Sequence, residues 1–543
     1  MKRSFVVIAV ILVAIGAVAG ALFGRLQSSA SAGTAITSER IAADYREALD
    51  VVGENYSGKA DRENVSDSSI QGMLWSLDPH SSFFTREEFE RLSQEQASQF
   101  YGIGVSIFQR RDGVYVQSIV PGTPAETAGL RYGDRITQVD GKDATEWTSN
   151  EVSKNVRGER GTTVKVKVER ANSATPIVFD IVRGGVPLPS IRNYFMLPNG
   201  VGYVGLTGGF QETTAEELNE ALEDLDKQGM KSLILDLRNN PGGILEQAVA
   251  VVSRFVPTDQ TVVSVKGRTG QSLSRELKSS GKDVEKLPLV VMMNGGSASA
   301  SEIVAGAIQD YGRGVVVGTD SFGKGLVQRV FRLPYGTGMT LTTARYYTPF
   351  GRSLQRDYSS GSIYDYYANH DEDSAEAIIE PKPVGIPVTL PDGRTLFGGR
   401  GIEPDVKAKP QEFSTQRARI NDAAFFFVRQ LVAGKVPGFE SYKVEKQSQV
   451  KSIQPGALSV TDRLFEAFRQ ITLSDKENGL AAENIASDVE YAKTRLRQEL
   501  VTANYSNEAG VQVLLETDPQ ILKATESIAV ARNMVEKNLA MRK

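Results

Sequence analysis

The stretch LILDLRNNPGGILEQAVAVV, from Leu233 to Val252, decides the fold of this 543-residue chain. Its beginning is apolar and typical of a buried strand, and its end predicts an apolar helix. The Asn-Asn-Pro-Gly-Gly between them is a turn sequence. Leu289–Met293 begins a second unit of the same kind, followed by a glycine loop and a helix near residues 301–309. This alternation predicts α/β architecture with loops at the strand ends, where ligands usually bind.

The segments around these two units extend the pattern. Residues 201–206 and 315–317 predict further strands, and Thr213 with Glu216 can form a capping box at the start of a helix. Residues 411–543 predict a helical C-terminal region. Residues 357–396 are acidic at first and then contain several prolines, which indicates an inserted loop within the core. The fold class expected is therefore α/β and multidomain.

A change of period marks a separate domain upstream of this core. Val105-Ser-Ile107 and Val114-Tyr-Val116 flank Asp112-Gly113, which is a strong hairpin signal. Residues 164–168 alternate valine with lysine and predict a half-buried strand. Residues 97–185 are thus expected to form a small β-rich domain. Residues 37–96, which precede it, predict a helical segment.

The amino terminus predicts export. Residues 5–24, FVVIAVILVAIGAVAGALFG, carry no charge, and about twenty apolar residues can cross a bilayer as one helix. The flanking Lys2 and Arg3 favour an amino end that stays in the cytoplasm. A cleaved signal peptide usually has a shorter apolar region of about 7–15 residues, although Ala30-Ser31-Ala32 resembles a cleavage site.

We therefore expect a periplasmic or otherwise extracytoplasmic protein, anchored to the inner (cytoplasmic) membrane by residues 1–24, with residues 25–36 as a linker. Release after cleavage near residue 33 is the alternative. A homo-oligomer formed through the helical segments is also considered.

Composition excludes several classes of function. The chain has no cysteine, which excludes thiol nucleophiles, zinc knuckles, iron–sulfur clusters and disulfides. Its two histidines, His80 and His370, are too few for a histidine-rich metal site, and a Ser-His-Asp triad would have to use one of them. A net charge of −4 gives no electrostatic case for binding nucleic acid. No metal and no cofactor are expected, and a hydrolase of this composition needs another way to activate its nucleophile.

Ser299 stands where the predicted strand turns into the helix of NGGSASASEIVAGAIQD, residues 294–310. A nucleophile at such a turn is exposed, and the free N–H groups of the first helical turn can stabilise an oxyanion. However, Ser299-Ala-Ser-Glu302 also has the spacing of a capping box. Ser299 or Ser301 can therefore be a simple helix cap.

Residues 318–325, GTDSFGKG, nearly match a phosphate-binding loop. Gly325 replaces the hydroxyl that should hold magnesium, and the following LVQRVFRL alternates like a strand. Without a helix amino terminus the phosphate loses its main support. A nucleotide-binding enzyme is therefore the least favoured function, and failure to bind ATP with magnesium would exclude it.

Lys324, in the same segment, has a second interpretation. Apolar residues precede and follow it, and burial lowers the pKa of a lysine. A shift from about 10.4 to about 7.5 costs roughly 4 kcal/mol. A lysine shifted in this way can be the general base for Ser299. The alternative is a solvated loop lysine.

These motifs together resemble those of the carboxyl-terminal processing peptidases, also called tail-specific proteases. The resemblance is carried by LDLRNNPGG, by Ser299-Ala-Ser-Glu302 and by FGKGLVQ at residues 322–328. It extends in order through LDPHSSFF (77–84), YGIGVSI (101–107), VPGTPAETAGLRYGDRI (120–136), ARYYTPFGRSLQ (344–355) and GGRGIEPDV (398–406). It covers roughly residues 37–410, and neither the long 357–396 segment nor the helical tail has a counterpart in it.

The resemblance implies a serine endopeptidase with a ClpP/crotonase-like core at residues 186–410 and a PDZ domain at residues 97–185. Its substrates would be exported or unfolded proteins, cleaved at or near their C-termini. The competing function is a catalytically idle PDZ scaffold that only binds peptides. That alternative requires Ser299, Lys324 and Gln328 all to be unused.

The catalytic assignments follow from the same resemblance. Ser299 would be the nucleophile, Lys324 the general base, and Gln328 the residue that holds and polarises the lysine. If the segment is a strand, residues 324, 326 and 328 share one face. The oxyanion hole would consist of the Ala300 N–H and the Gly243 N–H, with Gly242 as the alternative to Gly243.

The PDZ domain is expected to recognise the C-terminal tails of substrates. Such domains bind a chain terminus by adding it as a strand to a sheet edge. Gly102, Ile103, Gly104 and Val105 would form the peptide-binding stretch, because the two glycines let backbone N–H groups approach a terminal carboxylate. An ordinary glycine turn is the alternative on these residues alone.

Overall fold

The computed structural model describes residues 37–268, 274–282, 284–359, 366–367, 385–450 and 452–541. The predicted membrane segment, residues 5–24, lies outside the described residues. Within the described ranges, no helix is both long and apolar enough to cross a membrane. The chain divides into two compact units, residues 1–73 and 74–543.

Two helices account for the described part of the first unit: α2 (Ser38–Asn55) and most of α3 (Arg62–Trp75). Thr37 caps α2, since its hydroxyl accepts a hydrogen bond from the Arg40 N–H at 3.3 Å. The helix predicted to start after Thr37 is therefore present, although it has no buried residue.

A six-stranded sheet forms the centre of the second unit, in the order β10-β11-β12-β15-β16-β21. Its strands are β10 (Ile191–Leu197), β11 (Val201–Leu206), β12 (Ser232–Asp236), β15 (Leu289–Met293), β16 (Val315–Gly318) and β21 (Val406–Lys407). Only β10 is antiparallel to its neighbour; β11 to β21 are parallel. The strands predicted around residues 201–206, 233–237, 289–293 and 315–317 all belong to this sheet.

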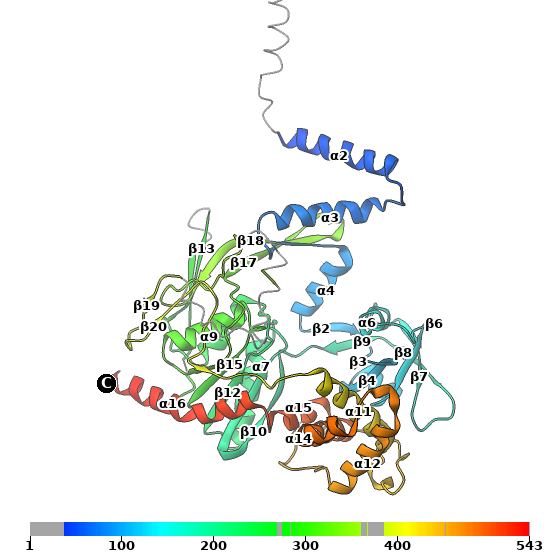
Figure 1. Cartoon of the computed structure of the whole chain (residues 1–543). Helices are drawn as coiled ribbons and strands as arrows, with labels where there is room; N and C mark the ends of the chain where they lie inside the picture. Colours follow the sequence, from blue (N-terminus) through cyan, green and yellow to red (C-terminus); the bar gives the residue numbers. More distant parts are fainter. Residues whose placement is uncertain are drawn as a thin grey trace, which may run out of the picture. The chain divides into compact units, whose positions relative to one another are not determined.

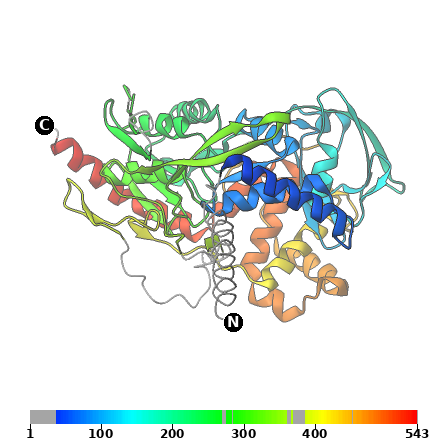
Figure 2. The same cartoon turned by 90° about the horizontal axis from the view of Figure 1, so that it is seen from above.

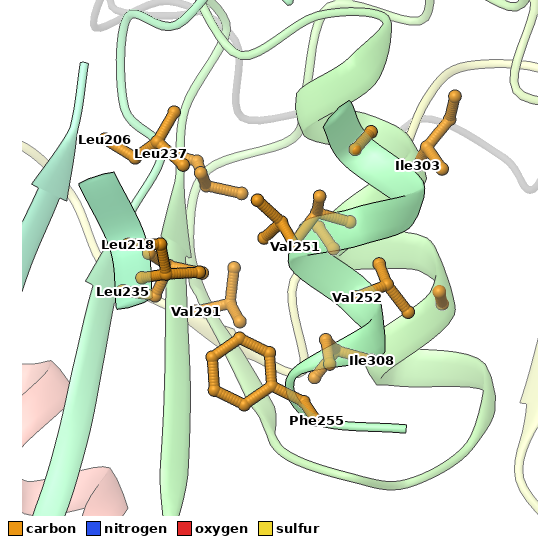
Figure 3. Packing of buried hydrophobic residues seen from close by; sticks show 14 of the residues in the cluster. Leu206, Leu218, Leu235, Leu237, Val251, Val252, Phe255, Val291, Ile303 and Ile308 are labelled. Atoms are coloured by element: carbon orange, nitrogen blue, oxygen red, sulfur yellow. The ribbon is translucent and has the colours of Figure 1, made fainter. Parts of the chain in front are cut away.

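Helices cover both faces of this sheet. Successive residues of each strand point to opposite faces, and both sets are buried. Leu235 and Val291 face α7 (Thr214–Lys227), α8 (Leu245–Ser253) and α9 (Ala300–Asp310), with the close packing shown in Figure 3. Ile234 and Val290 face the opposite way, against α16 (Pro519–Met541). Figure 2 shows α16, in red, running along the green strands. Helix α16 is thus part of the core built on this sheet.

The start of α7 differs from expectation in one detail. The Thr213 hydroxyl bonds to the Glu217 carboxylate at 2.5 Å. It makes no cap hydrogen bond to the helix. The capping box predicted between Thr213 and Glu216 is therefore wrong.

A second sheet has the order β1-β18-β13-β14, with β17 also paired to β18. The strands are β1 (Ser82–Phe84), β13 (Thr261–Gly267), β14 (Arg275–Lys278), β17 (Leu326–Arg332) and β18 (Gly338–Tyr347). β17 begins at Leu326, and its pairing shifts between Val327 and Gln328. The shift skips Thr343 of β18, so Leu326 and Gln328 keep the predicted alternation along β17. Lys324 precedes the strand, so the prediction of one shared strand face is wrong for residue 324 alone.

The predicted β-rich domain has the sheet order β3-β4-β5-β7-β8, with β6 on β5. Its elements are β3 (Val105–Arg110), β4 (Gly113–Ile119), α5 (Pro124–Ala128), β5 (Arg135–Val139), β6 (Lys142–Asp143), α6 (Ser149–Val156), β7 (Thr163–Glu169) and β8 (Ile177–Val182). The β3–β4 hairpin confirms the turn predicted at Asp112-Gly113. β2 (Gln99–Gly102) pairs with β9 (Gly184–Pro187), which joins the two ends of the domain.

The C-terminal helices pack against this domain, as Figure 1 shows. They are α11 (Thr415–Val432), α12 (Asp462–Ser474), α13 (Ala482–Ser487) and α14 (Val489–Asn504). The next helix, α15 (Asn507–Leu515), contacts α14 and β10 instead. Tyr115 and Tyr132 share one buried cluster with Phe425 of α11. The remaining elements are α4 (Arg86–Gln96), the hairpin β19 (Val388–Thr389) with β20 (Thr395–Leu396), and 3-10 turns at Pro198–Gly200, Pro334–Gly336, Glu440–Tyr442 and Lys476–Asn478.

Candidate active site

Ser299 occupies the turn between β15 and α9. Its backbone φ is 56° and its ψ is −112°, a region that residues with a Cβ rarely adopt. Such strain tends to occur at functional sites. The Ser299 N–H donates to Oε2 of Glu302 at 2.8 Å, and the Ser299 side chain makes no cap hydrogen bond. The helix is therefore capped from the glutamate side, and the serine hydroxyl is left for other contacts.

The two neighbouring serines are committed to structure. The Ser297 hydroxyl donates to the Leu237 carbonyl at 2.8 Å, and the Ser301 hydroxyl donates to the Asn240 carbonyl at 2.9 Å. Both side chains are fully buried, whereas Ser299 is half-buried and lines a cleft. Among the three serines of the SASAS run, Ser299 is thus the one that a substrate can reach.

The cleft at Ser299 has a volume of about 870 Å³. It brings together residues that are distant in the sequence: Gly242, Gly243, Ser299, Ala300, Lys324, Gln328 and Tyr346 line it. Its remaining lining is mixed: apolar residues such as Phe210, Ile303, Leu326 and Ala344 alternate with charged ones such as Glu246 and Arg275.

Lys324 lies in the loop between β16 and β17 and is half-buried. Burial lowers the pKa of its ammonium group below the ordinary 10.5, while the charges of Glu302 and Asp78 act in the opposite direction. The Lys324 carbonyl accepts a hydrogen bond from the Tyr346 hydroxyl. Because burial prevails over the two carboxylates, the neutral amine that a general base needs is favoured.

The buried carboxyl of Glu302 joins the serine turn to the lysine loop. Oε2 accepts from the Ser299 N–H at 2.8 Å and from the Lys324 N–H at 2.9 Å. Oε1 accepts from the Ser321 hydroxyl at 2.6 Å and from the Gly323 N–H at 2.7 Å. Burial raises the pKa of Glu302 to about 7, against these four hydrogen bonds, which favour the carboxylate. One side chain thus fixes Ser299 and Lys324 relative to each other.

The two glycines of LDLRNNPGG have different environments. The Gly242 N–H donates to the Asn240 side chain at 2.9 Å. A Cβ on Gly242 would lie 2.7 Å from the Ala298 carbonyl oxygen and 2.8 Å from the Ala300 nitrogen. In the part of the chain that the structure describes, the Gly243 N–H has no hydrogen-bond acceptor. Gly243 is therefore the better donor to an oxyanion, and Gly242 is the glycine that lets this loop approach Ser299.

Gln328 faces the same cleft but has a different partner from the one expected. Its amide donates to the Thr342 hydroxyl of β18 at 3.1 Å. The Gln328 amide is thus held by the neighbouring strand while its residue lines the same cleft as Lys324.

Three further residues of the site were not assigned chemistry from the sequence. Glu302 was considered only as a capping partner, and Tyr346 was quoted only within ARYYTPFGRSLQ. Asp78, in LDPHSSFF, accepts from the His80 N–H at 2.8 Å and from the Ser81 hydroxyl at 2.7 Å. The sequence signal that could have identified these three residues is that each lies in a motif shared with the family resemblance. Only the folded chain brings these motifs together.

The predicted peptide-binding stretch lies next to a sheet edge. β3, which starts at Val105, is the terminal strand of its sheet. Gly104 has a φ of 87°, and a Cβ there would lie 2.2 Å from the Thr123 hydroxyl oxygen. Ile103 is only 1% exposed, so its side chain belongs to the core of the domain and only its backbone is near a ligand at this edge. Gly102 ends β2.

Comparison with known proteins agrees with this arrangement. A model of peptidase family S41 matches residues 200–366, and a PDZ domain model matches residues 102–177. A carboxy-terminal-processing protease of Bartonella bacilliformis is 36% identical over 317 residues, which are 58% of this chain and 72% of that protein. The carboxy-terminal processing protease CtpA of Bacillus subtilis is 34% identical over 312 residues, which are 57% of this chain and 66% of that protein.

Solved structures of similar proteins include the photosystem II D1 C-terminal processing protease, with 27% identity, a TM-score of 0.35 and coverage of 68% of this chain and 93% of that chain. The PDZ domain of a carboxy-terminal protease from Vibrio cholerae, solved in complex with a peptide, is 31% identical, with a TM-score of 0.16 and coverage of 17% and 99%. On the sequence matches to the S41 and PDZ models and to the curated proteases, this chain belongs to the carboxy-terminal processing proteases of peptidase family S41, and it contains a PDZ domain.

Proposed function

We propose that this serine protease cleaves exported or unfolded proteins at or near their C-termini, with Ser299 as nucleophile, Lys324 as general base and Gln328 as a supporting residue. The observation that carries the proposal is the shared cleft. Ser299, Lys324 and the Gly242-Gly243 turn come from three separate loops and line the same cavity. A core of the ClpP/crotonase-like type is proposed with it, supported by the parallel strands whose carboxyl ends carry these loops.

The chemistry follows from the residue types. Neutral Lys324 accepts the Ser299 hydroxyl proton while the oxygen attacks the scissile carbonyl. The N–H groups of Gly243 and Ala300 bind the negative oxygen of the tetrahedral intermediate. Lys324 then gives its proton to the leaving amine, and an acyl-enzyme remains on Ser299. Water, deprotonated by the same lysine, attacks the acyl carbon; the bond to Ser299 breaks, the lysine returns the proton to the serine oxygen, and the new carboxyl end is released.

The PDZ domain is proposed to hold the substrate tail. An extended tail can pair with the free edge of β3, while the N–H groups around Gly104 bind the terminal carboxylate. Val105 and Ile107 are half-buried at this edge, so an apolar tail is expected to be preferred over a charged one. A scaffold that only binds peptides is less favoured, because the lowered pKa of Lys324 and the strain at Ser299 have no use in it.

The location is part of the same proposal. Residues 5–24 are uncharged and flanked by Lys2 and Arg3, which supports an anchor in the inner membrane with the body outside the cytoplasm. Fractionation of the native chain tests this, because a soluble chain shortened to about residue 33 would show cleavage and a cytosolic chain would contradict export. Self-association through the helical segments would be measured by sedimentation of the same preparation.

The activity is tested on an unfolded protein with an apolar C-terminal tail. The parent chain should cleave it, and Ser299→Ala should not. Ser301→Ala is the matched control, since it loses one buried hydrogen bond and should keep the activity with a modestly lower Tm. If Ser299→Ala kept the activity and Ser301→Ala lost it, the proposed nucleophile Ser299 would be wrong.

A further inference from the structure

An aromatic cluster lies beside the catalytic lysine loop. It consists of His80, Phe322, Tyr366 and Tyr367. The His80 ring centroid is 5.3 Å from that of Tyr366 and 6.1 Å from that of Phe322, in edge-to-face arrangements. The Arg356 guanidinium lies over Phe322 at 4.1 Å and over Tyr366 at 4.0 Å. Tyr366 and Tyr367 belong to the 357–396 segment, which has no assigned function.

The hydrogen bonds of this cluster lead to the backbone on both sides of Lys324. The Tyr366 hydroxyl is 2.7 Å from His80 Nε2, and it accepts from the Gln355 amide at 3.1 Å. Oε1 of Gln355 accepts from the Gly325 N–H at 2.9 Å. The Arg356 N–H donates to the Gly323 carbonyl at 3.0 Å. Gly323 and Gly325 are the immediate neighbours of Lys324, so the cluster is connected to the loop before and after the lysine.

A neutral His80 satisfies every contact of this network. In that arrangement the Tyr366 hydroxyl accepts from Gln355 and donates its own proton to His80 Nε2. The other ring nitrogen then carries the proton and lies 3.4 Å from the Tyr367 hydroxyl, which itself donates to the Pro79 carbonyl at 2.7 Å. Each donor meets an acceptor when His80 is neutral. Burial, followed by the charge of Lys324, lowers the pKa of His80 to about 3, which agrees with this assignment.

The charges around Lys324 come from several elements. Glu302 of α9 and Asp78 of the segment before β1 are the carboxyl groups that favour its charged form. Tyr346 of β18 bonds to its carbonyl. His80 is neutral, and the positive charge of Arg356 lies between two aromatic rings. The cluster therefore places aromatic rings, with one stacked guanidinium, beside the loop of a lysine for which burial prevails over the two carboxylates.

We propose that Tyr366 and His80 are positioning residues for Lys324: their hydrogen-bonded pair excludes water from one side of the lysine and, through Gln355, fixes the loop that carries it. This inference rests on the proposed function, since it gives Tyr366 a part in the activation of Ser299. It predicts that losing the pair makes the lysine better solvated and harder to deprotonate.

The test uses Tyr366→Phe in the full-length protein. This change keeps the ring contacts and removes only the hydroxyl. The matched control is Tyr358→Phe, from the same segment, whose ring is 6.3 Å from that of Tyr366 and whose hydroxyl is 3.5 Å from Arg345. The readout is the rate at which a fluorophosphonate probe labels Ser299 between pH 6 and 10, measured beside the Tm of each variant. Labelling requires the activated serine but no known substrate.

The expected result is a pH midpoint that moves upward by about one unit in Tyr366→Phe, with labelling at pH 7 about tenfold slower and an unchanged rate at the highest pH. Tyr358→Phe should behave like the parent. His80→Gln is the second variant and should show the same upward shift. A uniform loss of rate across all pH values, in parallel with a lower Tm, would show a purely structural role and overturn the inference, as would an unshifted midpoint in both variants.

The two proposals fail in different ways. If the parent labels no faster than Ser299→Ala at any pH, the proposed nucleophile is wrong and the positioning inference falls with it. If the parent labels and Ser299→Ala does not, but the midpoint of Tyr366→Phe equals that of the parent, only the positioning inference is wrong.

Discussion

At the residue scale, Lys324 is the group on which the proposed chemistry depends most directly. Its folded pKa lies below 10.5 because burial opposes the ammonium form. The neutral fraction at neutral pH is therefore larger than that of an exposed lysine, and it grows as the pH rises. The cleavage rate should rise with pH through this lowered pKa and then level off, which a pH–rate profile measures directly.

Lys324→Arg removes the base while keeping the charge. Arginine stays protonated at every accessible pH, so kcat should fall by about a hundredfold or more. Lys266→Arg, at an exposed lysine on β13, is the control and should leave kcat unchanged. Substantial activity in Lys324→Arg would remove this lysine from the mechanism.

Glu302→Gln tests the connection between the serine turn and the lysine loop. The carboxylate accepts four hydrogen bonds, whereas an amide would direct its own N–H groups at some of these donors. Each buried donor left without an acceptor costs about 1–3 kcal/mol, so the variant should have a lower Tm and a kcat reduced at least about tenfold. Glu223→Gln, at an exposed position of α7 away from the cleft, is the control. Parent-like kcat in Glu302→Gln would show that this clamp does not matter for catalysis.

At the element scale, the loop before β3 depends on glycine for a steric reason. Gly104 and Gly122 both have positive φ, 87° and 73°, but a Cβ at Gly104 would overlap the Thr123 side chain, whereas one at Gly122 would meet no atom within 4 Å. The two positions therefore form a matched pair. Alanine has a similar backbone free-energy cost at both, but its Cβ clashes only at Gly104.

Gly104→Ala should weaken binding of a peptide with a free, apolar C-terminus by at least about tenfold, because Thr123 or the loop has to move. Gly122→Ala should cost only the left-handed backbone penalty of about 1–2 kcal/mol in stability and keep the affinity. Fluorescence anisotropy with a labelled peptide measures this. The same peptide with an amidated end should bind weakly to both and to the parent; equal binding of the two peptides by the parent would mean that the terminal carboxylate is not recognised.

At the scale of the whole molecule, the helical tail and the PDZ domain are connected by a buried polar centre. Glu499 of α14 accepts from the Tyr132 hydroxyl at 2.8 Å and from the Gln117 amide at 2.9 Å, and it pairs with Arg110 at 3.6 Å. Arg110 also pairs with Asp422 of α11 at 3.6 Å. The tail thus holds the domain that is proposed to bind substrate.

Glu499→Ala should destabilise this connection by about 3 kcal/mol, because it leaves buried donors without their acceptor. The expected outcome is a lower Tm, together with a larger loss of cleavage for substrates that depend on their tails than for a short peptide that spans only the cleft. Glu490→Ala, at an exposed position of the same helix, is the control. A parent-like Tm in Glu499→Ala would contradict a structural connection at this site.

The sequence by itself was sufficient where the signal is local. The hairpin at Asp112-Gly113, the strand Leu289–Met293 and the helix after Ser299 agree with expectation, because turn residues and hydrophobic period act over a few neighbours. The motifs also identified the family. Contacts between distant segments could not be expected in this way. Gln328 donates a hydrogen bond to Thr342 of β18, at the point where the pairing of the two strands shifts. The side chain of Ile103 is buried in the core of its domain.

Only the tertiary structure could show that Glu302 joins Ser299 to Lys324, that Tyr366 reaches His80 and that α16 completes the protease core. Tyr366 and His80 are 286 residues apart in the chain, and neither sequence spacing nor composition predicts that they meet. Burial, which lowers the pKa of Lys324, is likewise a property of everything that packs around the lysine. The sequence determines which residues are available for the chemistry, and the packing of distant segments determines which of them are dry, close and correctly oriented.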